Sequence, residues 1–199
     1  MIFHNLPVIL YFRRLIHIVT RLFKRKTKMV NVEEKQHVCP VWVGYFLASP
    51  LRKLFQSPRT IIGNYIEKGM TVIDAGCAMG FFSLPMARMT GENGKVICID
   101  MQEKMLQKLM KRAKRAGLYN IIIPHKAEPS SLNITDIQNV AGFALAFAVV
   151  HEVPNKDVFF SELYKVLKPG GKLLVAEPRG HVSDQAFTLT MKIAQDKEF

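Results

Sequence analysis

The chain has few cysteines and no repeated unit. Its 199 residues include three cysteines, Cys39, Cys77 and Cys98, which are too few and too scattered for a disulfide framework or a zinc site, so no metal is expected. A reducing, cytoplasmic compartment fits this content. Glycine and proline, 12 and 10 residues, occur at ordinary levels, which excludes collagen-like and low-complexity chains. The 49% of hydrophobic residues instead indicates one globular domain with a sizeable core.

Acidic residues are absent from the first 28 positions, which hold seven lysines and arginines. The net charge of the whole chain is +12, so these seven charges leave +5 on the remainder. Most of the excess charge therefore belongs to a terminal segment and not to a groove on the domain. Nucleic-acid binding by the domain is only weakly indicated.

Residues 8–25 predict a basic amphipathic helix, with apolar side chains on one face and cations on the other. The longest apolar stretch, residues 6–12, is far short of the roughly 20 residues that span a bilayer. Three interpretations stay open. The helix could bind peripherally to an anionic membrane, at the inner face of that membrane. It could also dock on the domain. Alternatively, the working protein starts at Met29.

From residue 59 onward, short apolar runs alternate with amphipathic stretches, which is typical of an α/β fold with a parallel sheet covered on both faces. Helices are expected over residues 103–116, 156–168 and 182–195, with Asn155 and Ser183 as N-caps. The cationic face of the first of these helices is most simply solvated. Five strands are predicted, at residues 71–74, 95–100, 120–124, 143–149 and 172–176.

A glycine-bearing turn joins the first strand to the next helix, within residues 72–82. Gly76 and Gly80 have no Cβ, so a ligand could lie against the backbone there, beside the unpaired N–H groups of a helix N-terminus. Asp74 ends the first strand and Asp100 ends the second. An acidic residue at the second position can accept both hydroxyls of a ribose, which predicts a nucleotide-like ligand.

Four segments together resemble the class I S-adenosylmethionine-dependent methyltransferases, over about residues 60–180. The spacing is similar to the branch that contains quinone-biosynthesis and arsenite methyltransferases. The resemblance implies a Rossmann-like, doubly wound sheet of strand order 3-2-1-4-5, S-adenosylmethionine as cofactor and a small-molecule methyl acceptor. The matching segments are residues 74–80, 97–100, 143–154 and 167–175.

The resemblance also implies roles for individual residues. Those around the turn would surround the methionine end of the cofactor, Asp100 would hold the ribose, and Met101 would pack on the adenine. Ala127 and Glu128 would lie at the adenine edge, through a backbone amide and a side chain. Val149 and Val150 would face the methyl group. The turn residues in this set are Asp74, Gly76, Cys77, Ala78 and Gly80.

The chain departs from the family pattern in four places. Ala78 replaces a glycine, which is tolerable if its φ is negative. Lys126 stands where aspartate is common, and residues 142–144 lack the usual acidic residue. The sequence predicts no counterpart of the antiparallel strand pair that normally ends this fold. We therefore expect an exposed edge at the fifth strand, covered by another segment or by a second subunit of a homo-oligomer.

His151 is the titratable group best placed to accept a proton from a neutral acceptor, with Glu152 as its orienting partner. A structural histidine at a strand end is an equally good interpretation. Residues 29–58 precede the catalytic domain, 59–199, as a helical or lid segment, and 1–28 form the basic arm. Two other functions stay open: an NAD-dependent oxidoreductase, and a non-catalytic or membrane-associated binding protein on a shortened methyltransferase fold.

Overall fold

The computed structural model describes residues 2–3, 57–177 and 182–197. The amphipathic segment 8–25 and nearly all of the segment 29–58 lie outside these ranges. Among the described residues, no helix combines the length and the apolar character that a bilayer crossing requires.

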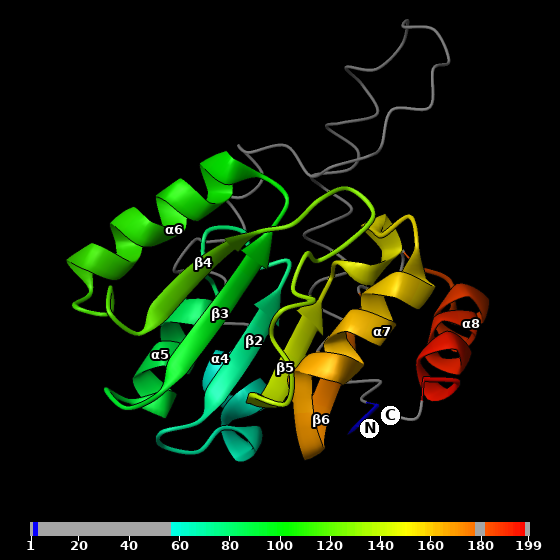
Figure 1. Ribbon diagram of the computed structural model, residues 1–199, viewed down its shortest axis with the longest axis horizontal. Coiled ribbons are helices and arrows are strands. Elements are labelled where there is room, and N and C mark those ends of the chain that lie inside the picture. Colours follow the sequence, from blue (N-terminus) through cyan, green and yellow to red (C-terminus); the bar gives the residue numbers. More distant parts are fainter. Residues whose placement is uncertain (1, 4–56, 178–181, 198–199) are drawn as a thin grey trace, which may run out of the picture.

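The centre of the fold is a sheet in which every pair of neighbouring strands is parallel (Figure 1). The spatial order is β1-β6-β5-β2-β3-β4. Numbered as the sequence predicts them, β2 to β6 follow the order 3-2-1-4-5, so the expected doubly wound topology is confirmed. The strands are β1 (Ile2–Phe3), β2 (Thr71–Ala75), β3 (Lys95–Asp100), β4 (Ile122–Lys126), β5 (Ala141–Phe147) and β6 (Leu167–Ala176).

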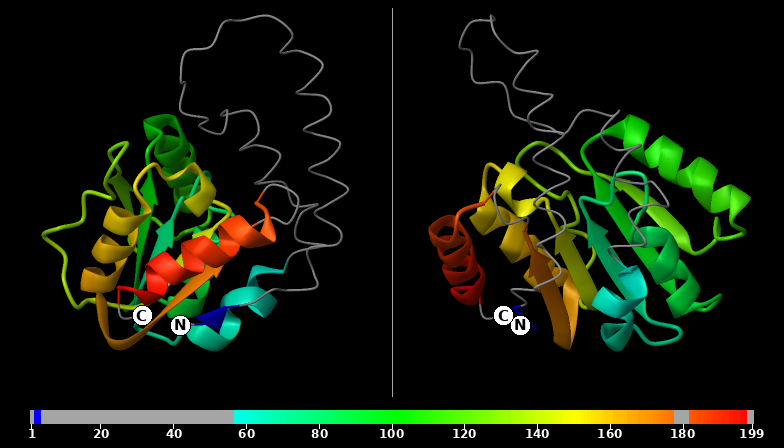
Figure 2. Two further views of the ribbon diagram at one scale, coloured as in Figure 1. Left: turned by 90° about the vertical axis from the view of Figure 1, so that its right-hand side faces the viewer. Right: turned by 180° about the vertical axis from the view of Figure 1, so that it is seen from behind.

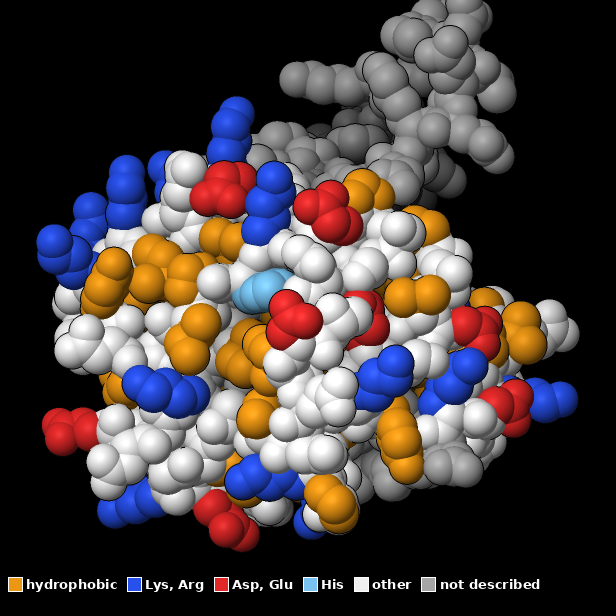
Figure 3. All heavy atoms as spheres, viewed as in Figure 1, with side chains coloured by type: hydrophobic (Ala, Val, Ile, Leu, Met, Phe, Trp, Pro, Cys, Tyr) orange, Lys and Arg blue, Asp and Glu red, His pale blue; other side chains and the backbone are white. Residues whose placement is uncertain are grey.

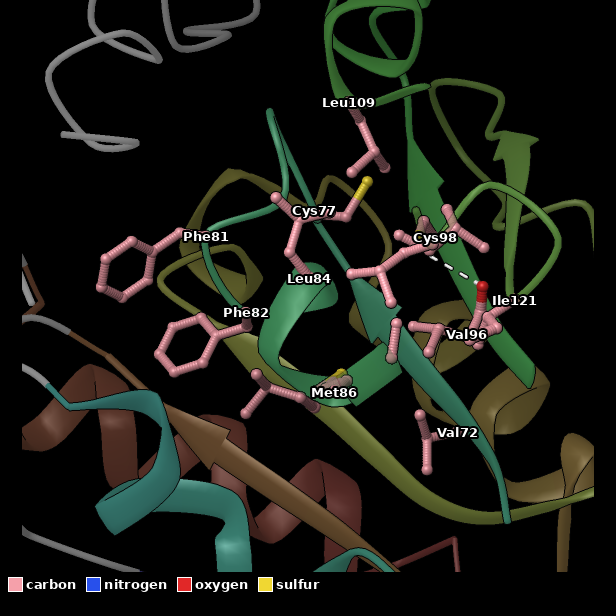
Figure 4. Packing of buried hydrophobic residues seen from close by; sticks show 14 of the residues in the cluster. Val72, Cys77, Phe81, Phe82, Leu84, Met86, Val96, Cys98, Leu109 and Ile121 are labelled. Atoms are coloured by element: carbon pink, nitrogen blue, oxygen red, sulfur yellow. Dashed lines mark hydrogen bonds between the residues drawn. The ribbon is translucent and has the colours of Figure 1, made fainter. Parts of the chain in front are cut away.

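Helices cover both faces of the sheet, and alternate strand residues point to each (Figures 1 and 2). Val72 and Val96 pack with α4, α5 and α6, as Figure 4 shows for the last two. Ile73 and Ile97 pack on the opposite face with α7 and α8. The helices are α4 (Pro58–Ile62), α5 (Ser83–Thr90), α6 (Glu103–Arg115), α7 (Lys156–Val166) and α8 (Asp184–Gln195), with short 3-10 turns η1 (Gly63–Tyr65) and η2 (Val150–Glu152).

Both predicted N-caps are confirmed. The side chain of Asn155 accepts a hydrogen bond from the N–H of Val158 at 3.1 Å, at the start of α7. Ser183 accepts one from Ala186 at 3.1 Å, at the start of α8. Each cap satisfies one of the backbone donors that the first turn of a helix leaves without a partner.

Several predicted boundaries were wrong: the strand expected at residues 172–176 begins five residues earlier, at Leu167, and others differ by about two residues. Helix α7 ends at Val166, because the next residue, Leu167, is already extended, with φ −73° and ψ 139°, and β6 begins there. Strand β5 ends at Phe147, because Ala148 has a φ of +55°. Strand β4 begins at Ile122, because the N–H groups of residues 121 and 122 turn back to the carbonyl of Leu118.

The edge next to β6 is occupied by a segment of the same chain. Strand β1 pairs in parallel with it, Ile2 opposite Leu174 and Phe3 opposite Val175. The opposite edge, β4, contains Pro124, which has no N–H to offer a further strand. Among the described residues, no strand follows β6.

Candidate functional site

The loops that follow β2, β3 and β5 meet at the carboxyl edge of the sheet, and β2 is central among these strands. The chain passes from β2 to β3 on one side and returns to β5 on the other. Such a change of direction leaves a crevice at the carboxyl ends, where doubly wound folds bind ligands. The residues predicted to bind the cofactor lie in these loops and in the loop after β4.

The turn after β2 is held by backbone hydrogen bonds to β3. The N–H groups of Gly76 and Cys77 both donate to the carbonyl of Ile99, at 2.9 and 3.0 Å, and the N–H of Gly80 donates to Cys77 at 2.9 Å. Gly76 and Gly80 have φ angles of +76° and +81°, which glycine adopts at little cost. The turn is therefore fixed by hydrogen bonds of its own backbone.

The expectation for Ala78 was wrong. Its φ is +45°, in the left-handed region that alanine rarely adopts. Its N–H donates to Oδ2 of Asp100 at 2.9 Å. This charge-assisted bond compensates part of the cost of the backbone conformation.

The two glycines of the turn make room for the protein's own side chains. A Cβ added at Gly76 would lie 2.5 Å from Cγ2 of Val149, and one added at Gly80 would lie 2.3 Å from Cδ1 of Leu109. Because Gly76 has no side chain, the loop after β5 can pack closely against the turn after β2. This contact places Val149 beside the turn.

Cys77 turns its side chain into the hydrophobic core (Figure 4). Its Sγ lies 3.7 Å from the carbonyl of Ala78. Burial raises the pKa of this thiol well above its ordinary value. Cys77 is therefore a neutral core residue, and only its backbone lies in the turn.

Asp100 ties two loops together. Its Oδ2 accepts the N–H of Ala78 at 2.9 Å and its Oδ1 accepts the N–H of Gln102 at 2.8 Å. Burial raises the pKa of this carboxyl, although both backbone bonds oppose the shift. Each carboxylate oxygen can accept a further hydrogen bond, so Asp100 retains capacity for hydroxyl groups of a ligand. Met101, next to it, is half-buried.

Asp74 is almost completely buried, with 3% of its surface exposed. Its Oδ2 accepts the hydroxyl of Ser83 at 2.5 Å. Ser83 begins α5, where the N-terminal end of the helix also favours a negative charge. The predicted acidic residue of β2 is therefore present at the start of the turn, held by the helix that follows.

The loop after β4 is pinned by a buried glutamate that sequence reasoning missed. Oε1 of Glu162, on α7, accepts the hydroxyl of Ser131, and Oε2 accepts the N–H of Leu132, both at 2.6 Å. One backbone amide and one side chain were expected near an adenine here. The backbone N–H groups of both residues already have protein partners: Ala127 donates to the carbonyl of Asp100 at 3.1 Å and Glu128 donates to the carbonyl of Ser131 at 2.9 Å.

Arg112 is a second residue that the sequence did not place in the site. It was expected on the solvated face of α6, but it is half-buried and its Nη1 donates to the carbonyl of Met79 in the glycine turn. Burial lowers the pKa of its guanidinium. The other cations of α6 are largely exposed, and Figure 3 shows lysine and arginine side chains gathered over this helix.

His151 lies in η2, directly after the loop that ends β5. Its Nδ1 is 2.7 Å from Oε2 of Glu177, whereas its Nε2 is 3.8 Å from Oε1 of Glu152. Val150, in the same turn, is completely buried. The carboxylate that orients the imidazole is thus Glu177 and not the predicted Glu152. Its position directly after β6 is the one sequence signal that could have indicated it.

The described residues contain no group of three or more histidine, cysteine, aspartate or glutamate side chains suited to a metal ion. What they bring together is a turn of tightly bonded backbone, two acidic strand ends and a histidine held by a carboxylate. This arrangement can grip a polar ligand at one end and exchange a proton at the other.

Comparisons with known proteins agree on one family. A family model described as a methyltransferase domain matches residues 66–198. The ubiquinone/menaquinone biosynthesis C-methyltransferase of Escherichia coli is 30% identical over 118 residues, which cover 59% of this chain and 46% of that protein. The chain therefore spans about half the length of the curated relatives it matches.

Solved structures show the same fold. A SAM-dependent methyltransferase from Aquifex aeolicus superimposes with a TM-score of 0.69 and 25% identity, over 79% of this chain and 88% of that one. An arsenic(III) S-adenosylmethionine methyltransferase from Chlamydomonas reinhardtii reaches a TM-score of 0.55 at 20% identity, over 65% of this chain and 52% of that one.

Proposed function

The chain belongs to the methyltransferase-domain family, and we propose that it transfers a methyl group from S-adenosylmethionine to a small-molecule acceptor. The observation that carries the proposal is the pairing of the turn after β2 with Asp100 at the end of β3. It combines close backbone approach with a carboxylate able to accept ribose hydroxyls, at the change of direction of the sheet.

The residues of this crevice fit the cofactor. We assign the ribose to Asp100, the adenine to Met101 and the loop at Ala127 and Glu128, and the methionine end to the turn that Asp74 begins. Because the N–H groups of both loop residues have protein partners, the adenine would be recognised there by side chains and by shape.

When bound, S-adenosylmethionine supplies an electrophilic methyl group: the bond from the acceptor atom to the methyl carbon forms as the carbon–sulfur bond breaks in line, and sulfur keeps the electron pair. The protein's task is then to align the acceptor and exclude water. We assign Val149 to the wall beside the reacting atoms. A neutral acceptor also has to lose a proton, and His151 is the base that would receive it at Nε2.

Calorimetric titration of the full chain with S-adenosylhomocysteine and with NADH tests the proposal. We expect the demethylated product to bind and the nicotinamide cofactor not to bind. Asp100→Ala should weaken binding of S-adenosylhomocysteine at least tenfold, because it removes the ribose acceptor and loosens the turn. Asp136→Ala, an equal change of charge at an exposed position, is the control.

Tight binding of NADH in place of S-adenosylhomocysteine would support an oxidoreductase and refute the methyl-transfer proposal. The acceptor can be sought by incubating cell extracts with a radiolabelled methyl donor and isolating the labelled product. A chain that binds the donor but labels no acceptor would instead be a non-catalytic binding protein on this fold.

A further inference from the structure

The carboxyl ends of β5 and β6 hold a histidine and a glutamate in a fixed relation. The two strands pair in register, with Phe147 opposite Ala176. The N–H of Ala148 then donates to the carbonyl of Ala176 at 2.7 Å. The pairing thus continues past the last residue of β5 and brings the chain after β6 next to the η2 turn.

Glu177 grips His151 at two points. One carboxylate oxygen accepts the backbone N–H of His151 at 3.1 Å, and the other lies 2.7 Å from Nδ1 of its ring. The Glu177 side chain is 3% exposed and that of His151 is 21% exposed. An ionised carboxylate only accepts hydrogen bonds, so Nδ1 carries the hydrogen. The neutral ring then presents its basic lone pair at Nε2, on the side away from Glu177.

We propose that Glu177 is a positioning residue for methyl transfer, which holds His151 in the Nδ1–H tautomer so that Nε2 receives the acceptor's proton. The inference rests on the proposed function. The proposal also restricts the class of acceptor to groups that lose a proton from the methylated atom, such as a hydroxyl group or an acidic C–H. A nucleophilic atom without a proton would need no base.

The neighbouring charges support this division of roles. Burial opposes the charged ring, but the hydrogen bond and charge of Glu177 outweigh it and, with Glu152, raise the pKa of His151. Lys156, on α7, acts in the opposite direction. Glu152 is 31% exposed and 3.8 Å from Nε2, so it adds negative charge without fixing the orientation of the ring.

Nitrogen-15 NMR of the full chain, with labelled histidine, tests the proposal without any acceptor. The chain has six histidines, and the resonance missing from His151→Asn identifies the ring of interest. We expect wild-type His151 to be the Nδ1–H tautomer when neutral and to titrate above its ordinary pKa of about 6.5. Glu177→Gln should lower that pKa and mix the tautomers, while Glu152→Gln should keep the tautomer.

A second measurement separates a positioned base from a structural pair. S-adenosylmethionine carries a positive charge on sulfur that S-adenosylhomocysteine lacks. If Nε2 lies beside the reacting atoms, the pKa of His151 should be lower in the first complex, by about one unit or more, because a nearby like charge disfavours the imidazolium. The same comparison in Glu177→Gln should also show the shift, from a lower starting value.

An Nε2–H tautomer in the wild-type protein would overturn the proposal, and this result needs no variant to fold. Equal titration of His151 in both complexes would show a histidine remote from the sulfonium, and would overturn it as well. Failure of both compounds to bind in calorimetry refutes the proposed function itself. That outcome is distinct, because the tautomer of His151 and its pKa in the free protein are measured without either compound.

Discussion

Substituting Gly76 tests whether the turn after β2 depends on its contact with the loop after β5. An alanine at this position needs a left-handed backbone, at φ +76°, and its Cβ would lie 2.5 Å from Cγ2 and 2.7 Å from Cβ of Val149. The backbone conformation costs roughly 1–2 kcal/mol, part of which is offset because alanine restricts the unfolded chain. Overpacking against a stiff, β-branched side chain adds about 1–3 kcal/mol.

We therefore expect Gly76→Ala to lower the free energy of unfolding by about 2–4 kcal/mol, measured by denaturant unfolding followed by circular dichroism. Gly69→Ala is the matched control, because Gly69 has a φ of +78° and no atom within 4 Å of an added Cβ. Gly69→Ala should lower the free energy of unfolding only by the cost of the left-handed backbone.

A double-mutant cycle isolates the contact. Val149→Gly removes both Cγ atoms and the Cβ, so in that background Gly76→Ala should cost no more than Gly69→Ala. Two results would contradict this reasoning: an equal loss of unfolding free energy for Gly76→Ala in both backgrounds, or a loss in the wild type no larger than that of Gly69→Ala. Either would show that the close approach of Val149 is not the reason for a glycine at position 76.

Three further predictions concern residues around the site. Ala78→Gly should raise the free energy of unfolding by up to about 1 kcal/mol, because glycine relieves the left-handed backbone and loses only part of that gain to chain entropy; a melting temperature equal to or below that of the wild type would contradict this. Glu162→Gln should lower the free energy of unfolding by about 2 kcal/mol, since two buried, charge-assisted bonds are replaced by weaker neutral ones, and should weaken binding of S-adenosylhomocysteine; unchanged unfolding and binding would show that the pinned loop carries neither effect. The raised pKa of His151 predicts that its pairing with Glu177 stabilises the fold fully below about pH 6.5, and that this contribution is lost as the pH rises through the higher folded-state pKa; the difference in stability between wild type and His151→Gln should follow that course, and a difference that is constant with pH would refute the assignment.

The centre of the sheet was predictable because β2, β3 and β5 are buried on both faces and so appear as short apolar runs. Parallel pairing followed from the helices between the strands, whereas the strand order 3-2-1-4-5 was implied by the resemblance to the methyltransferase family. The predicted strand boundaries were wrong where the residue type does not indicate the backbone conformation. An example is Ala148, whose φ of +55° ends β5. Ala78 failed for the same reason, since nothing in its neighbours indicates that Asp100 holds its N–H.

Within the site, residues at strand ends were predictable and their partners were not. Asp74, Asp100 and His151 stand where apolar strands stop, and strand ends share one edge of a parallel sheet. Glu177 lies 26 positions from His151, and Arg112 lies 33 positions from the carbonyl it binds. Long side chains such as these contact residues on other helices and strands, and a single sequence does not show which residues they contact.

The double attachment of Asp100 affects how its substitution should be interpreted. Alanine scanning equates a fall in affinity with the worth of a lost contact, but the Asp100 carboxylate also holds the N–H groups of residues 78 and 102. Its removal would leave Ala78 in a costly conformation with no compensating bond. Part of the loss of binding free energy in the variant would then come from restoring the conformation of the turn and not from the lost ribose contact. The 2′-deoxy analogue of S-adenosylhomocysteine, bound to the wild-type protein, would report the sugar contact by itself.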